Sequence, residues 1–132
     1  MGKFNISQFS PCEDGKEFYL KFDTFEDAWN NCQRGDWMLW IAKKLKVDLR
    51  LLTLAKGHCS ATVLHLMKDE RSKNAVEVAI AFGEGKATLE QLTAARVYAA
   101  AYAASYANRK QTSDICRQFL TEEVFKIINQ KK

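Results

Sequence analysis

Apolar residues spaced for one face of a helix constrain the fold of this chain more than any other feature. They stand at positions i, i+3, i+4 and i+7 in two stretches: Phe25, Ala28, Trp29 and Cys32, then Ala75, Val78, Ala79 and Phe82. This spacing places the side chains on a single helical face, which is stable when it is buried. The 132 residues include one proline and six glycines, too few for a fold built on many turns. The pattern predicts an all-α protein with one hydrophobic core.

Residues that can cap a helix precede several of these stretches. Thr24 with Asp27 forms a capping box, and Thr88 with Gln91 forms another. Asp48 is placed to cap a third helix, since a carboxylate accepts hydrogen bonds from the first free amides. The caps therefore predict helices that begin close to these three positions.

The apolar stripes and their caps together divide the chain into helices joined by short turns. The expected helices cover residues 10–22, 24–34, 36–46, 48–67, 72–83, 88–109 and 113–130. Gly15 leaves a short hairpin as the alternative for the first of them, and the last can break at Thr121. Residues 1–9 are expected to be irregular. The whole chain, residues 1–132, is predicted to be a single-domain bundle of six or seven helices around a central Ala-rich helix.

A dense aromatic block, GDWMLW at residues 35–40, follows the second predicted helix. Gly35 is expected to end that helix in the left-handed conformation, and Asp36 is expected to cap the next one. Trp37 and Trp40 then share an inner face, and Trp29 lies one helix earlier. These five residues are predicted to form a structural corner of the bundle.

Charge and composition exclude several classes of protein. The net charge of +4 is weak evidence for nucleic-acid binding. A helix-turn-helix around residue 35 would present tryptophans instead of base-reading polar groups, so no nucleic-acid partner is predicted. No stretch approaches the roughly 20 apolar residues of a membrane span, and the first residues do not form a secretory signal. We therefore expect a cytoplasmic protein without a membrane partner.

The residues that could carry chemistry are scattered. Cys12, Cys32, Cys59 and Cys116 form no CxxC pair and are expected to be small buried hydrophobic residues. His58 and His65 are seven residues apart, which is roughly 10 Å along a helix and too far to share one metal ion. No glycine-rich phosphate loop is present. The sequence predicts no catalytic site, no metal and no cofactor, and hence no enzyme.

Two features are candidates for contact with a partner protein. Tyr98, Tyr102 and Tyr106 recur every four residues on one side of the Ala-rich helix. Such a row is a binding surface if it is exposed, and a core face with hydroxyls at its rim if it is not. His58 and His65, at the flank of the preceding apolar stripe, are the other candidates.

The order of these parts resembles a family of bacterial immunity proteins. The matching segments are TFEDAWNNCQRGDWMLWIAKKL, VDLRLLTLAKGHC, GEGKATLEQLTAARVYAAAYAASYA and SDICRQFL. They are similar to the all-helical immunity-protein-five-like family, which is proposed to accompany polymorphic toxins. The resemblance covers about residues 11–124, and the Ala-rich helix is shorter here than in many relatives.

The resemblance implies a protein that binds a cognate bacterial toxin and neutralises it by occlusion. It names no functional residue to carry over. The alternative is a regulatory helical module that binds a small molecule in a pocket near Trp29 and Trp37. The two hypotheses differ in one observable way, because a closed and filled core at that corner would exclude the second.

Overall fold

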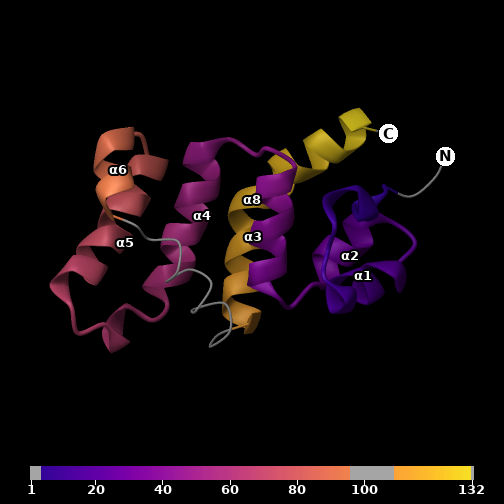
Figure 1. The fold of residues 1–132 in the computed structure, drawn as a ribbon, viewed down its shortest axis with the longest axis horizontal. Helices are drawn as coiled ribbons and strands as arrows, with labels where there is room; N and C mark the ends of the chain where they lie inside the picture. Colours follow the sequence, from indigo (N-terminus) through magenta and orange to yellow (C-terminus); the bar gives the residue numbers. More distant parts are fainter. Residues whose placement is uncertain (1–3, 96–108, 132) are drawn as a thin grey trace.

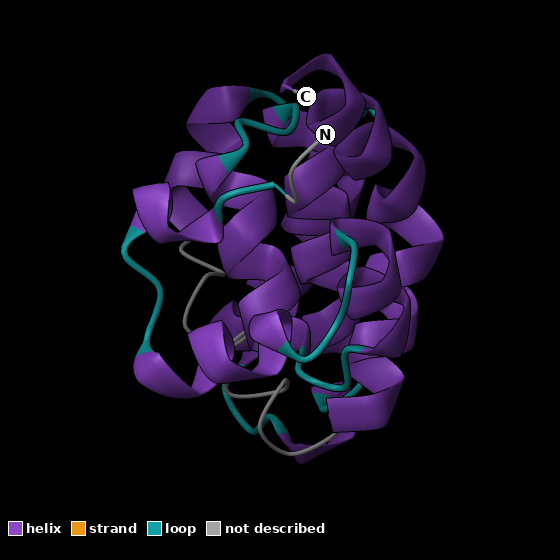
Figure 2. Ribbon diagram, turned by 90° about the vertical axis from the view of Figure 1, so that its right-hand side faces the viewer, coloured by secondary structure: helices purple, strands orange, loops and turns teal. Residues whose placement is uncertain are grey.

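The computed structural model of the chain describes residues 4–95 and 109–131. Its elements are η1 (Ile6–Phe9), α1 (Glu13–Leu20), α2 (Phe25–Asn31), α3 (Gly35–Lys44), α4 (Leu49–Ala61), η2 (Leu64–Leu66), α5 (Glu70–Gly83), α6 (Leu89–Ala95) and α8 (Arg109–Lys131). The described residues contain helices, turns and loops and no strand (Figure 2). The predicted all-α class is confirmed. The Ala-rich segment that was expected at the centre begins in α6, and its remainder lies outside the described residues.

The helices follow one another across an elongated bundle (Figure 1). α5 and α6 lie at one end, α1 and α2 lie at the other, and α4, α8 and α3 stand between them. α4 packs against α5 on one side and against α8 on the other, and α8 also packs against α3. The larger core lies among α1, α2, α3, α4 and α8, and a smaller one lies beneath α5 and α6. No helix of the described ranges is long and apolar enough to cross a bilayer.

Three helix starts are those that the caps predicted. The hydroxyl of Thr24 accepts from the amide of Asp27 at 3.1 Å, and the Asp48 carboxylate accepts from the first amides of α4. Thr88 and Gln91 bond reciprocally, with 2.7 Å from the Thr88 amide to the Gln91 side chain and 3.2 Å in the opposite direction. Each cap satisfies amides that lack a partner within the helix.

Other predicted boundaries were wrong. α1 is a helix and not a hairpin, but it begins at Glu13, because Ser10 adopts a left-handed backbone (φ 54°) that ends η1. Residues 6–9, predicted to be irregular, form that 3₁₀ helix. α5 begins at Glu70 and not near residue 72, since the Asp69 carboxylate accepts from the Arg71 amide and caps it.

The ends of α4 and α8 also differ from the prediction. α4 stops at Ala61 instead of continuing to residue 67, because the Thr62 hydroxyl donates to the Cys59 carbonyl at 2.7 Å and competes with the helical pattern. α8 does not break at Thr121. The Thr121 hydroxyl donates to the carbonyl of Arg117 at 2.6 Å, within the same helix, so it does not start a new one.

Candidate ligand-binding site

The corner between α2 and α3 is built differently from the prediction. α2 ends at Asn31, and Gly35 is the first residue of α3 instead of the left-handed end of α2. Gly35 is needed for packing, because a Cβ there would lie 2.7 Å from the Oγ1 of Thr112 and 3.2 Å from its carbonyl carbon. Thr112 lies on α8 and is completely buried. The missing side chain therefore lets the start of α3 lie directly against α8.

Asp36 does not cap α3, because the helix begins one residue before it. Its carboxylate accepts two hydrogen bonds from the guanidinium of Arg34, at 2.9 and 2.7 Å. The same guanidinium lies 4.4 Å from the centroid of the Trp37 ring. Arg34 is thus held by a carboxylate and by an aromatic face at the entrance to α3.

Arg117 of α8, which the sequence analysis overlooked, fixes the end of α2. One guanidinium nitrogen donates to the carbonyl of Trp29 at 3.1 Å and to that of Cys32 at 2.6 Å. The other donates to Ser113 and, at 2.8 Å, to Asp114, whose pKa is lowered by its hydrogen bonds to Arg117 and Lys110. Carbonyls at a helix end lack intrahelical partners, so this cation ties α2 to α8. The only hint of this role in the sequence is that Arg117 is a positively charged residue within the apolar stripe of the last predicted helix.

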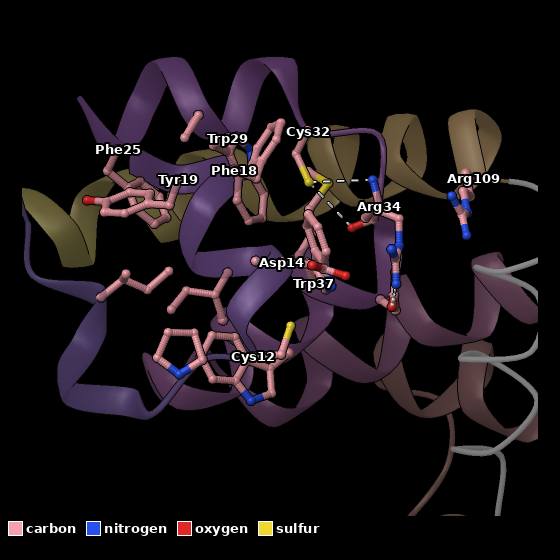
Figure 3. Close-up of a pocket in the computed structure, with 18 residues that line it drawn as sticks. Cys12, Asp14, Phe18, Tyr19, Phe25, Trp29, Cys32, Arg34, Trp37 and Arg109 are labelled. Carbon is pink, nitrogen blue, oxygen red and sulfur yellow. Dashed lines mark hydrogen bonds and ion pairs between the residues drawn. The ribbon is translucent and has the colours of Figure 1, made fainter. Parts of the chain in front are cut away.

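The corner encloses a pocket of about 620 Å³ (Figure 3). It lies between η1, α1, α2 and α3, with one contribution from α8. The residues that line it are Ile6, Pro11, Cys12, Asp14, Gly15, Phe18, Tyr19, Phe25, Ala28, Trp29, Cys32, Arg34, Asp36, Trp37, Met38, Trp40, Ile41 and Arg109. The corner therefore contains a pocket and is not a closed, filled core. The hypothesis of a small-molecule site near Trp29 and Trp37 is not excluded.

The floor and the rim of the pocket differ. The floor is buried and apolar, and Trp29, Phe25 and Met38 are part of it. Trp37 and Trp40 pack against the larger core but are only half-buried, so the prediction that they share the inner face of α3 holds only in part. Smaller residues of α3 fill that inner face instead: Met38, Leu39, Ile41 and Ala42. The two tryptophans are thereby left at the side of the helix, where they line the pocket.

Neighbouring rings and chain contacts hold the walls in place. Trp29 is buried, its indole N–H donates to the Thr121 hydroxyl at 2.8 Å, and its ring stacks on Phe25 with 6.2 Å between centroids. The hydroxyl of Tyr19 donates to the carbonyl of Phe4, which pins the N-terminal segment to α1. Burial, and to a lesser degree Glu26, raises the pKa of Tyr19 to about 12, so the phenol is a neutral donor.

The four cysteines fall into two groups. Cys32, Cys59 and Cys116 are buried, as predicted, whereas Cys12 is exposed and the prediction for it was wrong. Cys12 stands at the uncapped start of α1, outside the core, and lines the pocket together with Cys32. Burial raises the pKa of the Cys32 thiol. Among the described residues, no group of three or more His, Cys, Asp or Glu side chains could hold a metal ion.

Neither of the two histidines predicted to bind a partner lines this pocket. His58 is half-buried in α4 and stacks on Phe119 with 4.7 Å between ring centroids, whereas His65 is exposed on η2. Tyr98, Tyr102 and Tyr106 lie outside the described residues. The structure brings together the residues that were predicted to form a structural corner. The pocket is lined by Trp29, Asp36, Trp37 and Trp40. Gly35 lies beside them, where the start of α3 contacts α8.

Comparison with known proteins adds no assignment. No protein-family model, curated protein or solved structure matches this chain. The fold and the site define an all-helical domain with an aromatic pocket at one end.

Proposed function

We propose that this protein is a binding module that takes a small, largely apolar organic molecule into the pocket at the Trp29–Trp37 corner. The observation that carries the proposal is the pocket itself, with a volume of about 620 Å³. Sites for cofactors and drug-sized ligands have volumes of roughly 300–1,000 Å³ and are lined mostly by apolar and aromatic groups with a few polar ones. This pocket has the same size and composition.

Partly exposed aromatic rings in the pocket favour the binding of an apolar ligand. Trp37 and Trp40 are half-buried although they belong to a helix whose inner face is fully packed. Phe18 is also half-buried, and its ring lies 5.8 Å from that of Trp37. A ligand that covers these rings gains roughly 25 cal/mol for each Å² of apolar surface removed from water.

The walls are held by contacts that do not require a ligand. Arg117 fixes the end of α2 to α8, and Tyr19 holds η1 and its flanking residues through Phe4. Gly35 sets the distance between α3 and α8. A site that is already formed loses little conformational entropy on binding, which favours affinity for a small molecule.

The proposal is tested by closing the pocket. A Cβ at Gly15 of α1 would lie 3.8 Å from the Trp37 ring, so the side chain of Gly15→Leu would extend into the cavity. Thermal shift with a library of uncharged and charged aromatic fragments would be measured on the wild type and on this variant. Glu17→Leu, at an exposed position of the same helix outside the pocket, is the matched control.

We expect fragments that raise the melting temperature of the wild type and of Glu17→Leu to have no effect on Gly15→Leu. A ligand present at about 100 times its Kd stabilises the folded state by roughly 2.7 kcal/mol, which a thermal scan detects readily. The proposal fails if no fragment stabilises the wild type, or if Gly15→Leu responds as the wild type does.

A second candidate function is the neutralisation of a bacterial toxin, which rests on the resemblance to immunity proteins. Exposed groups on η2 favour a protein contact there, because Leu66 is 65% exposed beside the exposed His65. An apolar side chain next to a titratable one suits the centre of an interface. The net charge of +4 would steer an acidic partner surface toward this chain.

The toxin hypothesis has its own experiment. The product of the neighbouring gene would be co-expressed with this protein, and both cell survival and complex formation would be measured. Leu66→Asp should weaken the complex, whereas Leu20→Asp, at an equally exposed position on α1, should not. Absence of both rescue and complex would refute this function and leave the small-molecule proposal intact.

A further inference from the structure

We infer that the pocket selects an organic cation of the alkylammonium or arylammonium class. The inference rests on the proposed function, since it assigns the chemical class of the ligand that this same pocket binds. Two properties of the pocket carry it. They are the electron-rich faces of its aromatic rings and the distribution of charge among its polar residues.

The aromatic rings at the rim suit a cation. The faces of tryptophan rings attract cations that lie within about 6 Å of the ring centroid. Trp37 already makes such a contact with the guanidinium of Arg34, at 4.4 Å from its centroid. Phe18 and Trp40 line the pocket beside it and are half-buried. A quaternary or alkylated ammonium fits such a set of rings, because it is large, positive and weakly hydrated.

Asp14 supplies a negative charge to the same space. It stands in the first turn of α1, lines the pocket and is exposed. Its turn lies against the indole, because a Cβ added at the neighbouring Gly15 would lie 3.8 Å from the Trp37 ring. Figure 3 shows Asp14 in the middle of the side chains that line the cavity. Within residues 4–95 and 109–131, the Asp14 carboxylate makes no hydrogen bond and no ion pair, so its charge remains available to a ligand.

The cations of the pocket do not make it an anion site. The Arg34 charge is offset by Asp36, which accepts two hydrogen bonds from it. Arg109 is exposed and, in Figure 3, stands at the end of the group farthest from Tyr19 and Phe25. The first turn of α1, which would otherwise attract an anion, carries both Glu13 and Asp14. An anion near the aromatic rings would therefore meet the Asp14 carboxylate, whereas the guanidinium that lies over Trp37 is already bound to Asp36.

Three probes of one shape separate the effect of charge from that of size. They are choline, its neutral isostere 3,3-dimethyl-1-butanol, and the anion 3,3-dimethylbutanoate. Binding is measured by NMR from the indole N–H signals of the three tryptophans. We expect choline to bind about 5- to 20-fold more tightly than the neutral alcohol, the range of a cation–π contact in a partly desolvated site, and the anion to bind most weakly.

Matched variants test the role of Asp14. Asp14→Asn should reduce the preference for choline over the alcohol to about twofold or less. Glu13→Gln removes the same charge from the same turn of α1, but Glu13 does not line the pocket, so the preference should remain. Gly15→Leu should abolish binding of all three probes. Both charge variants lie at exposed positions, and unchanged circular dichroism would confirm that they fold.

The outcomes are distinguishable. If the alcohol binds as tightly as choline, or if Asp14→Asn and Glu13→Gln behave alike, the inference is overturned. The proposed function nevertheless stands if Gly15→Leu still abolishes that binding. If millimolar concentrations of all three probes leave the indole signals unmoved, the inference is overturned, and the fragment experiment then decides the proposed function separately.

Discussion

Gly35→Ala tests the contact that sets the position of α3 and hence of the pocket. The added methyl group would lie 2.7 Å from the Oγ1 of Thr112, 2.9 Å from its Cβ and 3.2 Å from its carbonyl carbon. Carbon atoms in contact are normally about 3.5–4.0 Å apart. A rotation of the Thr112 side chain moves the hydroxyl, but it moves neither the Cβ nor the backbone carbon. The two helices must therefore separate.

The expected magnitude is the difference between two effects. An added methyl group in a packed core costs about 1–3 kcal/mol. Replacement of glycine by alanine within a helix returns about 0.5–1 kcal/mol, less at a first helical position such as this one. We expect a net loss of about 1–2 kcal/mol of unfolding free energy. For a chain of 132 residues this corresponds to a fall of about 3–8 °C in melting temperature.

The assay is urea unfolding followed by tryptophan fluorescence, with Gly15→Ala as the control of opposite sign. At Gly15 the atoms nearest to an added Cβ are the Sγ of exposed Cys12, at 3.3 Å, and the Trp37 ring, at 3.8 Å. The thiol can turn aside, so Gly15→Ala should gain about 0.5–1 kcal/mol through helix propensity. If Gly35→Ala is as stable as the wild type, Gly35 does not set the contact between α3 and α8.

Further predictions concern other parts of the molecule. Burial, together with Lys43, lowers the pKa of Lys56 to about 8, so between about pH 8 and 10.5 the folded state binds fewer protons than the unfolded state and stability rises with pH. The unfolding free energy of Lys56→Met relative to the wild type should therefore fall by about 1–2 kcal/mol from pH 7 to pH 9.5 in urea melts. Arg117→Met should lose about 2–4 kcal/mol in the same assay, since two carbonyls lose a charged donor. Arg71→Met, at a side chain that is 95% exposed, should change stability by less than about 0.5 kcal/mol. A thiol reagent should label only Cys12 of the four cysteines in the native protein and all four in urea.

Features decided within one helical turn were predictable from the sequence. Thr24, Asp48 and Thr88 each cap a helix through an amide two or three residues away, so the sequence contains both partners of the bond. The all-α class follows from stripes of the same short range. Asp69 is a cap of the same kind, but it lies in the turn expected between the helices at residues 48–67 and 72–83.

Features decided by distant partners were not predictable from local patterns. A glycine between two helical stretches is typical of a helix end, and nothing near Gly35 indicates that Thr112 in α8 lies against it. The same holds for Arg117, whose partners are carbonyls at the end of α2. Trp37 was expected inside because it is large and apolar, but it lies at the pocket because smaller residues fill the inner face of α3.

Gly15 links the stability of the corner to its proposed function. A glycine inside a helix lowers the stability of the protein by about 0.5–1 kcal/mol relative to alanine. Gly15 lines the pocket, and a side chain added there would face the Trp37 ring. A leucine there would remove that cost, cover the Trp37 ring and fill part of the cavity. We therefore expect Gly15→Leu to raise the unfolding free energy by about 1–2 kcal/mol while it abolishes ligand binding. Stabilising substitutions that remove activity are characteristic of sites kept open for a ligand. If Gly15→Leu is instead less stable than the wild type in urea unfolding, the glycine is required for packing of α1. The explanation that Gly15 keeps the pocket open for a ligand would then be refuted.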